Sequence, residues 1–157
     1  MYRFLIFGNS GSGKSTLAKK LGQDLHIPIL DLDTIVWEQN QIAIRRNHEN
    51  VSNDLRDFLA NNNSWVIEGC YSTLIKIALE LATEIYFLNP GIDKCLENNR
   101  HRPWEPHKFK SPQEQAETFE FLNSWIQQYT ERDDEFGYSS HCAIFEKFQG
   151  KKHEIRE

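Results

Sequence analysis

Short apolar runs alternate with helical stripes along the chain. The runs have the length of strands and cover residues 2–7, 27–30, 65–67 and 85–88. Continuous apolar runs indicate strands that are covered on both faces. Between the runs, apolar residues recur every three to four positions, which predicts helices. Strands that alternate with helices favour an α/β fold, with a parallel sheet and helices on both of its faces.

Stripes at helical spacing predict where the helices lie. They cover residues 17–25, 51–59, 74–81, 93–100, 113–132 and 141–148. Three prolines within residues 101–112 exclude a continuous helix there, whereas residues 34–50 show no clean period. Residues 151–156 are the candidate for a fifth strand.

Aromatic residues crowd the predicted helix 113–132. Phe119 and Tyr129 fall on one face of this helix, and Phe121 and Trp125 form a second apolar row. Core packing is the simplest explanation, and a dimer face or a ligand-binding surface is the alternative. We therefore expect a monomer or a homodimer.

Length and composition indicate one globular domain, residues 1–157. The chain is 39% hydrophobic and 26% charged, and it contains no run of about 18 apolar residues that would span a membrane. Its first apolar stretch leads into a glycine-rich loop rather than to a signal-peptide cleavage site. We expect a cytoplasmic protein with no membrane attachment.

Charge and cysteine content narrow the possible partners. The formal net charge of −5 gives no general attraction to nucleic acid, so binding of DNA or RNA would need a local basic surface. Cys70, Cys95 and Cys142 are odd in number and scattered, without a Cys-x-x-Cys pair. This pattern predicts reduced thiols and argues against a zinc site.

A glycine-rich loop between the first strand and the first helix has the spacing of a phosphate-binding loop. Its residues are Gly8, Asn9, Ser10, Gly11, Ser12, Gly13, Lys14, Ser15 and Thr16. Glycines let the backbone curl so that its N–H groups point at phosphate oxygens, while Lys14 supplies a positive charge. The Ser15 hydroxyl can hold Mg²⁺. We therefore predict a site for ATP and Mg²⁺, with an ordinary Gly/Ser turn as the alternative.

Acidic residues follow two of the other predicted strands. Asp31 and Asp33 lie two positions apart on what we expect to be one extended segment, so both side chains should point to the same side. One could accept a proton from an attacking hydroxyl, and the other could hold the water shell of the metal or the substrate. Glu68 ends the third strand, and Gly69 would let a ligand approach the backbone. The alternatives are solvated carboxylates that cap turns.

Basic residues gather in two places. Arg45 and Arg46 could clamp an anionic acceptor through their forked donors, or could be a surface pair. Residues 100–110 carry Arg100, Arg102, Lys108 and Lys110 against one acid, Glu105, a local charge of +3. This contrast with the net charge makes residues 100–112 a candidate lid over the γ-phosphate. The alternative is a basic loop without a ligand.

With these motifs in order, the chain resembles the small P-loop kinases of the adenylate kinase and shikimate kinase type. Residues 8–22, 30–37 and 65–72, the last reading Trp-Val-Ile-Glu-Gly-Cys-Tyr-Ser, are most similar to bacterial proteins known as topology modulation or adenylate-kinase-related proteins. The resemblance spans about residues 1–102. It implies five parallel strands in the order 2-3-1-4-5, ATP and Mg²⁺ at the loop, and lid arginines at Arg100 and Arg102.

Together these features favour an ATP-dependent phosphotransferase that acts on a small-molecule acceptor, a nucleotide or a metabolite. Lys14, with Mg²⁺ on Ser15, would hold the β- and γ-phosphates, and Asp33 would be the base or a group of the metal shell. Asp31, Arg45 and Arg46 would position the acceptor, next to Glu68 and Gly69. The alternative is a nucleotide-dependent regulator that acts on DNA topology or on a protein partner.

Overall fold

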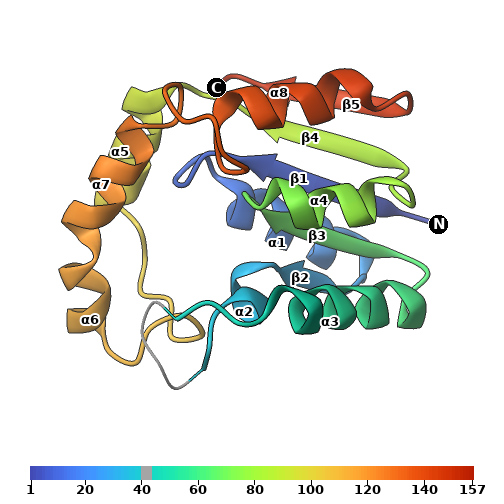
Figure 1. The fold of residues 1–157 in the computed structure, drawn as a ribbon, viewed down its shortest axis with the longest axis horizontal. Helices are drawn as coiled ribbons and strands as arrows, with labels where there is room; N and C mark the ends of the chain where they lie inside the picture. The colour runs from blue at the N-terminus through green and yellow to red at the C-terminus, as the bar shows by residue number, and fades with distance from the viewer. Residues whose placement is uncertain (40–43) are drawn as a thin grey trace.

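The computed structural model describes residues 1–39 and 44–157, and it contains one five-stranded sheet flanked by helices (Figure 1). The strands are β1 (Arg3–Gly8), β2 (Ile29–Asp31), β3 (Trp65–Gly69), β4 (Glu84–Leu88) and β5 (Lys151–Ile155). The helices are α1 (Lys14–Leu25), α2 (Asp33–Val36), α3 (His48–Asn61), α4 (Ser72–Leu79), α5 (Ile92–Arg100), α6 (Pro112–Glu117), α7 (Phe119–Gln127) and α8 (Tyr138–Lys147). None of the helices described is long and apolar enough to span a bilayer.

The strand order is β2-β3-β1-β4-β5, and every pairing is parallel. This confirms the predicted α/β class and strand order, and it confirms the fifth strand. The register sets Glu68 of β3 opposite Ile6 of β1 on one side and Asp31 of β2 on the other. Because all the strands run in the same direction, their carboxyl ends share one edge of the sheet, where ligands bind in open α/β folds.

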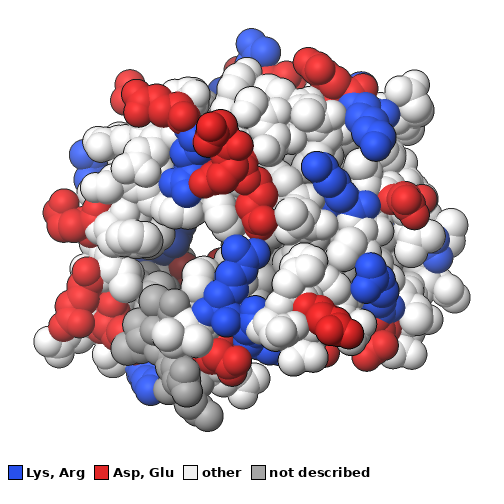
Figure 2. Space-filling model, viewed as in Figure 1, with Lys and Arg blue, Asp and Glu red and all other residues white. Residues whose placement is uncertain are grey.

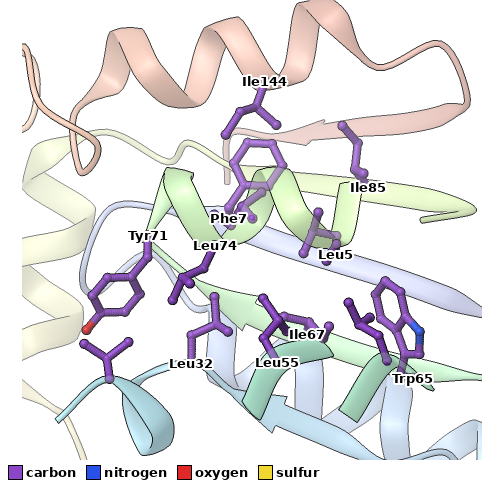
Figure 3. Close-up of a cluster of buried hydrophobic side chains, with 14 of the residues drawn as sticks. Leu5, Phe7, Leu32, Leu55, Trp65, Ile67, Tyr71, Leu74, Ile85 and Ile144 are labelled. Carbon is purple, nitrogen blue, oxygen red and sulfur yellow. The ribbon is translucent and has the colours of Figure 1, made fainter. Parts of the chain in front are cut away.

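Helices cover both faces of the sheet, because alternate side chains of each strand point to opposite faces. On one face, Leu5 and Phe7 belong to a core with Leu55 of α3, Leu74 of α4 and Ile144 of α8 (Figure 3). On the other face, a smaller core with α1 contains Phe4, Ile6, Ala18, Val66 and Leu88. The inner strands β1 and β3 and most of β4 are therefore buried on both sides, as their continuous apolar runs indicate. The edge strands β2 and β5 are half-buried or exposed, so the expectation of burial on both faces is wrong for β2.

The α5–α7 pair lies beside the carboxyl edge of the sheet and forms the far side of the molecule from β5 (Figure 1). Residues 101–111 connect α5 to α6 without helix or strand, as their prolines predict. This segment leaves α5, crosses toward α2 and returns to α6.

The prediction of one helix over residues 113–132 is wrong in two respects. The helical segment is divided into α6 and α7 at Thr118, and α7 ends at Gln127. At Thr118 both the backbone N–H and the side-chain hydroxyl donate to the Gln115 carbonyl, three residues earlier, the latter at 2.7 Å. A Thr side chain that competes for backbone acceptors bends a helix in this way.

Candidate active site

The phosphate loop joins β1 to α1 and adopts a backbone conformation that its glycines permit. Gly11 and Gly13 have φ angles of 78° and 98°, in the left-handed region that favours glycine. A Cβ atom at Gly11 would also lie 2.5 Å from the Cys95 carbonyl oxygen of α5, so a side chain does not fit there. The loop ends at the amino terminus of α1, where free N–H groups and the helix dipole favour an anion. The loop geometry agrees with a phosphate cradle.

Two asparagines fasten the phosphate loop to the neighbouring helices. The Asn9 side chain is buried and donates to the Ile126 carbonyl of α7 at 3.2 Å. Asn98 of α5 donates to the Gly11 carbonyl at 2.8 Å. Asn98 carries no motif in the sequence, and only the packing of α5 beside the loop brings it into the site. These bonds hold the loop against α7 and α5, and residues 101–111 leave from the end of α5.

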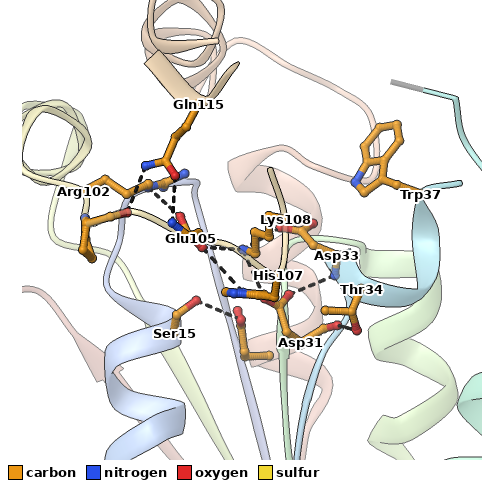
Figure 4. A network of polar contacts seen from close by, with 12 residues as sticks. Ser15, Asp31, Asp33, Thr34, Trp37, Arg102, Glu105, His107, Lys108 and Gln115 are labelled. Atoms are coloured by element: carbon orange, nitrogen blue, oxygen red, sulfur yellow. Dashed lines mark hydrogen bonds and ion pairs between the residues drawn. The ribbon is translucent and has the colours of Figure 1, made fainter. Parts of the chain in front are cut away.

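Lys14, Ser15 and Glu68 meet at the base of the loop. The Lys14 ammonium donates to the Asn9 carbonyl at 2.6 Å, within the loop itself. The Ser15 hydroxyl, in the first turn of α1, donates to Glu68 Oε1 of β3 at 3.0 Å (Figure 4). Glu68 is 3% exposed. A hydroxyl and a carboxylate are the oxygen donors that Mg²⁺ prefers, so these residues fit that ion.

The protein donors at this point are few. Within residues 1–39 and 44–157, no group of three or more His, Cys, Asp or Glu side chains could hold a metal ion. Mg²⁺ in phosphoryl-transfer sites is held by one or two protein oxygens together with phosphate oxygens of the nucleotide. Ser15 and Glu68 therefore suit a metal that arrives with a nucleotide rather than a resident ion.

Burial, together with the nearby Asp31 carboxylate, raises the pKa of Glu68 from an ordinary value of 4.5 to about 7, although Lys14 and Lys108 act in the opposite direction. Between these two pH values the folded protein holds a proton that the unfolded chain has lost. The free energy of unfolding should therefore fall as the pH rises from about 4.5 to about 7, by about 3 kcal/mol.

Glu68→Gln should remove this part of the pH dependence and make the protein more stable than wild type at pH 8, because Gln carries no charge. Urea unfolding at pH 5 and pH 8, without Mg²⁺ or nucleotide, measures the effect. Glu120→Gln on the exposed surface of α7 is the matched control. Equal pH dependence in wild type and Glu68→Gln would contradict the assignment of the raised pKa.

Asp31 and Asp33 converge, although they do not share an extended segment as predicted. β2 ends at Asp31, the chain turns at Leu32 (φ −59°, ψ −27°), and Asp33 begins α2. The Asp33 N–H donates to Asp31 Oδ1 at 2.9 Å, which stabilises this turn. The two carboxylates meet through their other oxygens, because both contact the ammonium group of Lys108.

Lys108, on the segment 101–111, forms ion pairs with Asp31 and Asp33 where β2 ends and α2 begins (Figure 4). Its ammonium nitrogen lies 3.1 Å from Asp31 Oδ2, 3.0 Å from Asp33 Oδ2 and 3.3 Å from Glu105 Oε2. Burial would lower the pKa of Lys108, but these three carboxylates together raise it. His107 also approaches Asp31, with Nε2 at 3.6 Å from Oδ2. The basic segment therefore does reach the site, and it does so through Lys108.

Replacing Lys108 with Gln should release the segment from the strand end. The variant leaves Asp31, Asp33 and Glu105 without their shared cation, and breaking a partly buried ion pair in this way is destabilising. We expect amide hydrogen exchange at residues 105–109 to become about tenfold faster, equivalent to about 1.4 kcal/mol of opening free energy. Lys110→Gln, an exposed change on the same segment, is the control. Equal protection in both variants would show that Lys108 does not hold the segment.

Of the predicted acceptor residues, Arg45 lies over the Tyr71 ring and Arg46 does not point to the site. The Arg45 guanidinium is 5.5 Å from the ring centre of Tyr71, whose hydroxyl bonds Asp33, and it pairs with Glu135 at 3.1 Å. Arg46 donates to the Ile35 carbonyl and to Asp54 of α3, both at 2.7 Å. Arg46 therefore links α2 to α3.

Gly69 is close to a side chain rather than to open space. A Cβ atom there would lie 2.8 Å from Leu32 Cδ1, so Gly69 is needed where the turn after β2 packs on β3. Its absent side chain makes room for Leu32, which is fully buried. The geometry thus gives Gly69 a packing role that the sequence pattern does not indicate.

Arg100 and Arg102 line a cavity of about 430 Å³ beside the segment 101–111. Trp104, Phe119 and Leu122 also line it. Arg102 contacts Glu105 at 3.6 Å, whereas Arg100 is exposed at the end of α5. In this structure Lys108, and not these two arginines, is the basic residue at Asp31 and Asp33.

A hollow opens between the α6–α7 side of the molecule and the sheet, and both acidic and basic side chains border it (Figure 2). It lies near the carboxyl ends of the strands, the edge that carries the phosphate loop, Asp31 and Glu68. Cations and carboxylates on one concave surface can bind a metal–nucleotide complex, which carries charges of both signs.

The fold and the phosphate loop define this chain as a P-loop protein with the fold of the small P-loop kinases. The model of the NACHT domain family matches residues 2–133. The chain therefore belongs to the NACHT domain family.

Two solved structures share this fold, and a curated relative matches a short stretch of the sequence. A gluconokinase from Sinorhizobium meliloti is 15% identical with a TM-score of 0.55, covering 99% of this chain and 83% of that one. A sugar kinase from Janibacter is 13% identical with a TM-score of 0.53, covering 100% and 87%. A shikimate kinase from Bacteroides fragilis is 46% identical over 39 residues. That match spans 25% of this chain and 22% of the enzyme.

Proposed function

We propose that this protein is an ATP-dependent phosphotransferase that transfers the γ-phosphate to a hydroxyl or phosphate group of a small molecule. One observation carries the proposal. The segment 101–111 places Lys108 on Asp31 and Asp33, at the same sheet edge as the phosphate loop and the Ser15–Glu68 pair. A nucleotide-binding loop alone would suit any P-loop protein, whereas carboxylates and a cation beside the loop can supply the base and the charge neutralisation that phosphoryl transfer to an acceptor uses.

Each residue has a role that follows from its position. The loop N–H groups and Lys14 would bind the β- and γ-phosphates, and Ser15 and Glu68 would hold Mg²⁺, directly or through water. Bound Mg²⁺ would neutralise charge on the phosphates. Asp33 would accept the proton of an acceptor hydroxyl, whose oxygen attacks the γ-phosphorus while the bond to the β-phosphate oxygen breaks.

The remaining residues would place the acceptor and exclude water. Lys108 would neutralise negative charge on the acceptor and on the transferred phosphate. Asp31 and Arg45 would orient the acceptor. The names of the two structural neighbours support a small polyhydroxylated acceptor as the first class to test. Nucleoside monophosphates and shikimate are the second and third classes, because of the sequence resemblance.

The test is an acceptor screen by two readouts. Thermal unfolding is followed with a non-hydrolysable ATP analogue and Mg²⁺ present, while sugars, sugar acids, shikimate and nucleoside monophosphates are added singly. A true acceptor stabilises the folded state by mass action, by about 2.7 kcal/mol at a hundred times its dissociation constant. ADP formation from ATP with the same compound must then exceed ADP formation without it.

Two outcomes would contradict the proposal. Failure of the protein to bind MgATP would remove the nucleotide site. Binding of MgATP, with ADP formation that no acceptor class increases and that a DNA or protein partner does increase, would favour a nucleotide-dependent regulator.

A further inference from the structure

The two oxygens of the Asp33 carboxylate face different surroundings. Oδ1 accepts a short hydrogen bond from the Tyr71 hydroxyl. Oδ2 faces the segment 101–111 and lies 3.0 Å from the Lys108 ammonium (Figure 4). Lys108 belongs to the segment 101–111, whereas Tyr71 belongs to the core between β3 and α4. One oxygen is thus held by the rigid part of the fold and the other by the segment that covers the site.

Tyr71 is itself held firmly. The residue is 3% exposed and lies at one end of the core around Leu5 and Phe7. Its hydroxyl is directed away from the other labelled side chains (Figure 3). Its backbone carbonyl accepts the first bonds of α4, from the N–H groups of Leu74 and Ile75. Its ring packs edge-on against Phe136 at 5.4 Å between ring centres. The position of the hydroxyl is therefore determined by the core.

A third residue determines the direction of the bond. Trp37 Nε1 donates to the Tyr71 hydroxyl oxygen at 3.1 Å. Because an indole N–H can only donate, the Tyr71 oxygen acts as the acceptor on that side, and its single proton is free to point at Asp33. The hydrogen bonds from Trp37 to Tyr71 and from Tyr71 to Asp33 therefore occupy Oδ1. Oδ2 is left as the oxygen that can receive a proton from a bound acceptor.

We propose that Tyr71 is a positioning residue that fixes Oδ1 of Asp33 and so aims Oδ2 at the acceptor. This inference rests on the proposed function, in which Asp33 is the base. The bond also stabilises the ionised form of Asp33, since a carboxylate that accepts a hydrogen bond loses a proton more easily. A base must be ionised before it can act, so the same bond sets both the direction and the charge of Asp33.

Charged groups from several elements face Asp33. These are Lys108 of the segment 101–111, Lys14 of α1, Asp31 of β2 and Glu68 of β3. Burial alone would raise the pKa of Asp33, but Lys108, the Tyr71 hydroxyl and Lys14 together lower it. Loss of the Tyr71 hydroxyl leaves the two cations in place, so the change measured on removing it belongs to that one bond.

The experiment compares Tyr71→Phe with Tyr86→Phe. Tyr86 also donates its hydroxyl to a carboxylate, Glu84 at 3.1 Å, but at the opposite end of β4 from the site. The Asp33 pKa is read by ¹³C NMR of labelled aspartate, assigned with Asp33→Asn, and by the pH profile of MgATP hydrolysis with water as acceptor. Tyr71→Phe should raise the Asp33 pKa by about one unit and move the acid limb of the profile by the same amount. Tyr86→Phe should change neither.

The outcomes separate this inference from the proposed function. The Kd for MgATP should stay within about threefold in Tyr71→Phe, because the phosphate loop is untouched. If Asp33→Asn hydrolyses MgATP at the wild-type rate, Asp33 is not the base and the proposed mechanism is wrong. Suppose that Asp33→Asn hydrolyses MgATP more slowly than wild type, but the Asp33 pKa is the same in Tyr71→Phe and Tyr86→Phe. Asp33 is then still the base, and the proposed role of Tyr71 is wrong.

A second variant covers the case in which Tyr71→Phe does not fold. Trp37→Phe keeps the Tyr71–Asp33 bond but removes the donor behind it, at a side chain that is 39% exposed. The Asp33 pKa should then be higher than in wild type, and the increase should be smaller than in Tyr71→Phe. An unchanged Asp33 pKa in Trp37→Phe, when Tyr71→Phe cannot be studied, would overturn the inference.

Discussion

Lys14→Ala should weaken MgATP binding about a hundredfold and abolish phosphoryl transfer. Lys14 begins α1 directly after the phosphate loop, and its ammonium bonds the Asn9 carbonyl of that loop. With nucleotide bound, the same ammonium can reach the phosphates, where an ionic hydrogen bond contributes about 3 kcal/mol. Isothermal titration of MgATP measures the affinity, and ADP release measures turnover.

Lys20→Ala is the control for this variant, because Lys20 is an exposed lysine of the same helix. It removes the same charge from α1 without removing a phosphate ligand. Equal MgATP affinity in Lys14→Ala and Lys20→Ala would show that Lys14 does not bind phosphate. It would also contradict the interpretation of the loop as a phosphate cradle.

Asp33→Asn should lower the rate of phosphoryl transfer by about 10²- to 10⁴-fold, with little change in MgATP affinity. General base catalysis typically contributes this much, and an amide cannot take the proton. The variant keeps the shape of the side chain, and its one amide oxygen can still accept a hydrogen bond from Tyr71 or from Lys108, so the fold should persist. Turnover is measured with the acceptor that the screen identifies, together with hydrolysis of MgATP.

The matched control for Asp33→Asn is Asp24→Asn, an exposed position on α1. A second comparison is Asp31→Asn, which shares Lys108 but lacks the Tyr71 bond. If Asp31→Asn loses as much turnover as Asp33→Asn while the acceptor KM is unchanged, then Asp31 and not Asp33 is the base. Full activity in Asp33→Asn would exclude it from the chemistry.

The strands and most helices could be predicted because their signal is local. Apolar runs such as Phe4–Phe7 are buried on both faces of the sheet, so they contain no polar positions that would obscure the pattern. The prediction of one continuous helix over residues 113–132 fails at Thr118, because the Thr118 hydroxyl bonds the Gln115 carbonyl within a stripe that is otherwise continuous. Periodicity cannot report a side chain that competes with the backbone.

The candidate site divides in the same way. The positions of the phosphate loop and of Glu68 at strand ends could be predicted, the loop from its glycine and lysine spacing and Glu68 from the apolar run that it ends. The roles of these residues stay predictions. Lys108 could be recognised only as part of a basic segment, since nothing in the sequence says which of its four cations reaches Asp33. Tyr71 and Asn98 lacked any signal, because their roles come from partners 38 and 87 residues away.

Hydrophobic periodicity and glycine spacing act over a few residues, so they are sufficient to predict the α/β class and a phosphate loop between the first strand and the first helix. The strand order was expected from a resemblance, and the structure confirms that order. Which charges meet at the sheet edge depends on tertiary contacts and has no local signal. Burial there is shared by segments far apart in the chain, and a carboxylate such as Glu68 acquires its raised pKa only when strands from both sides exclude water from it.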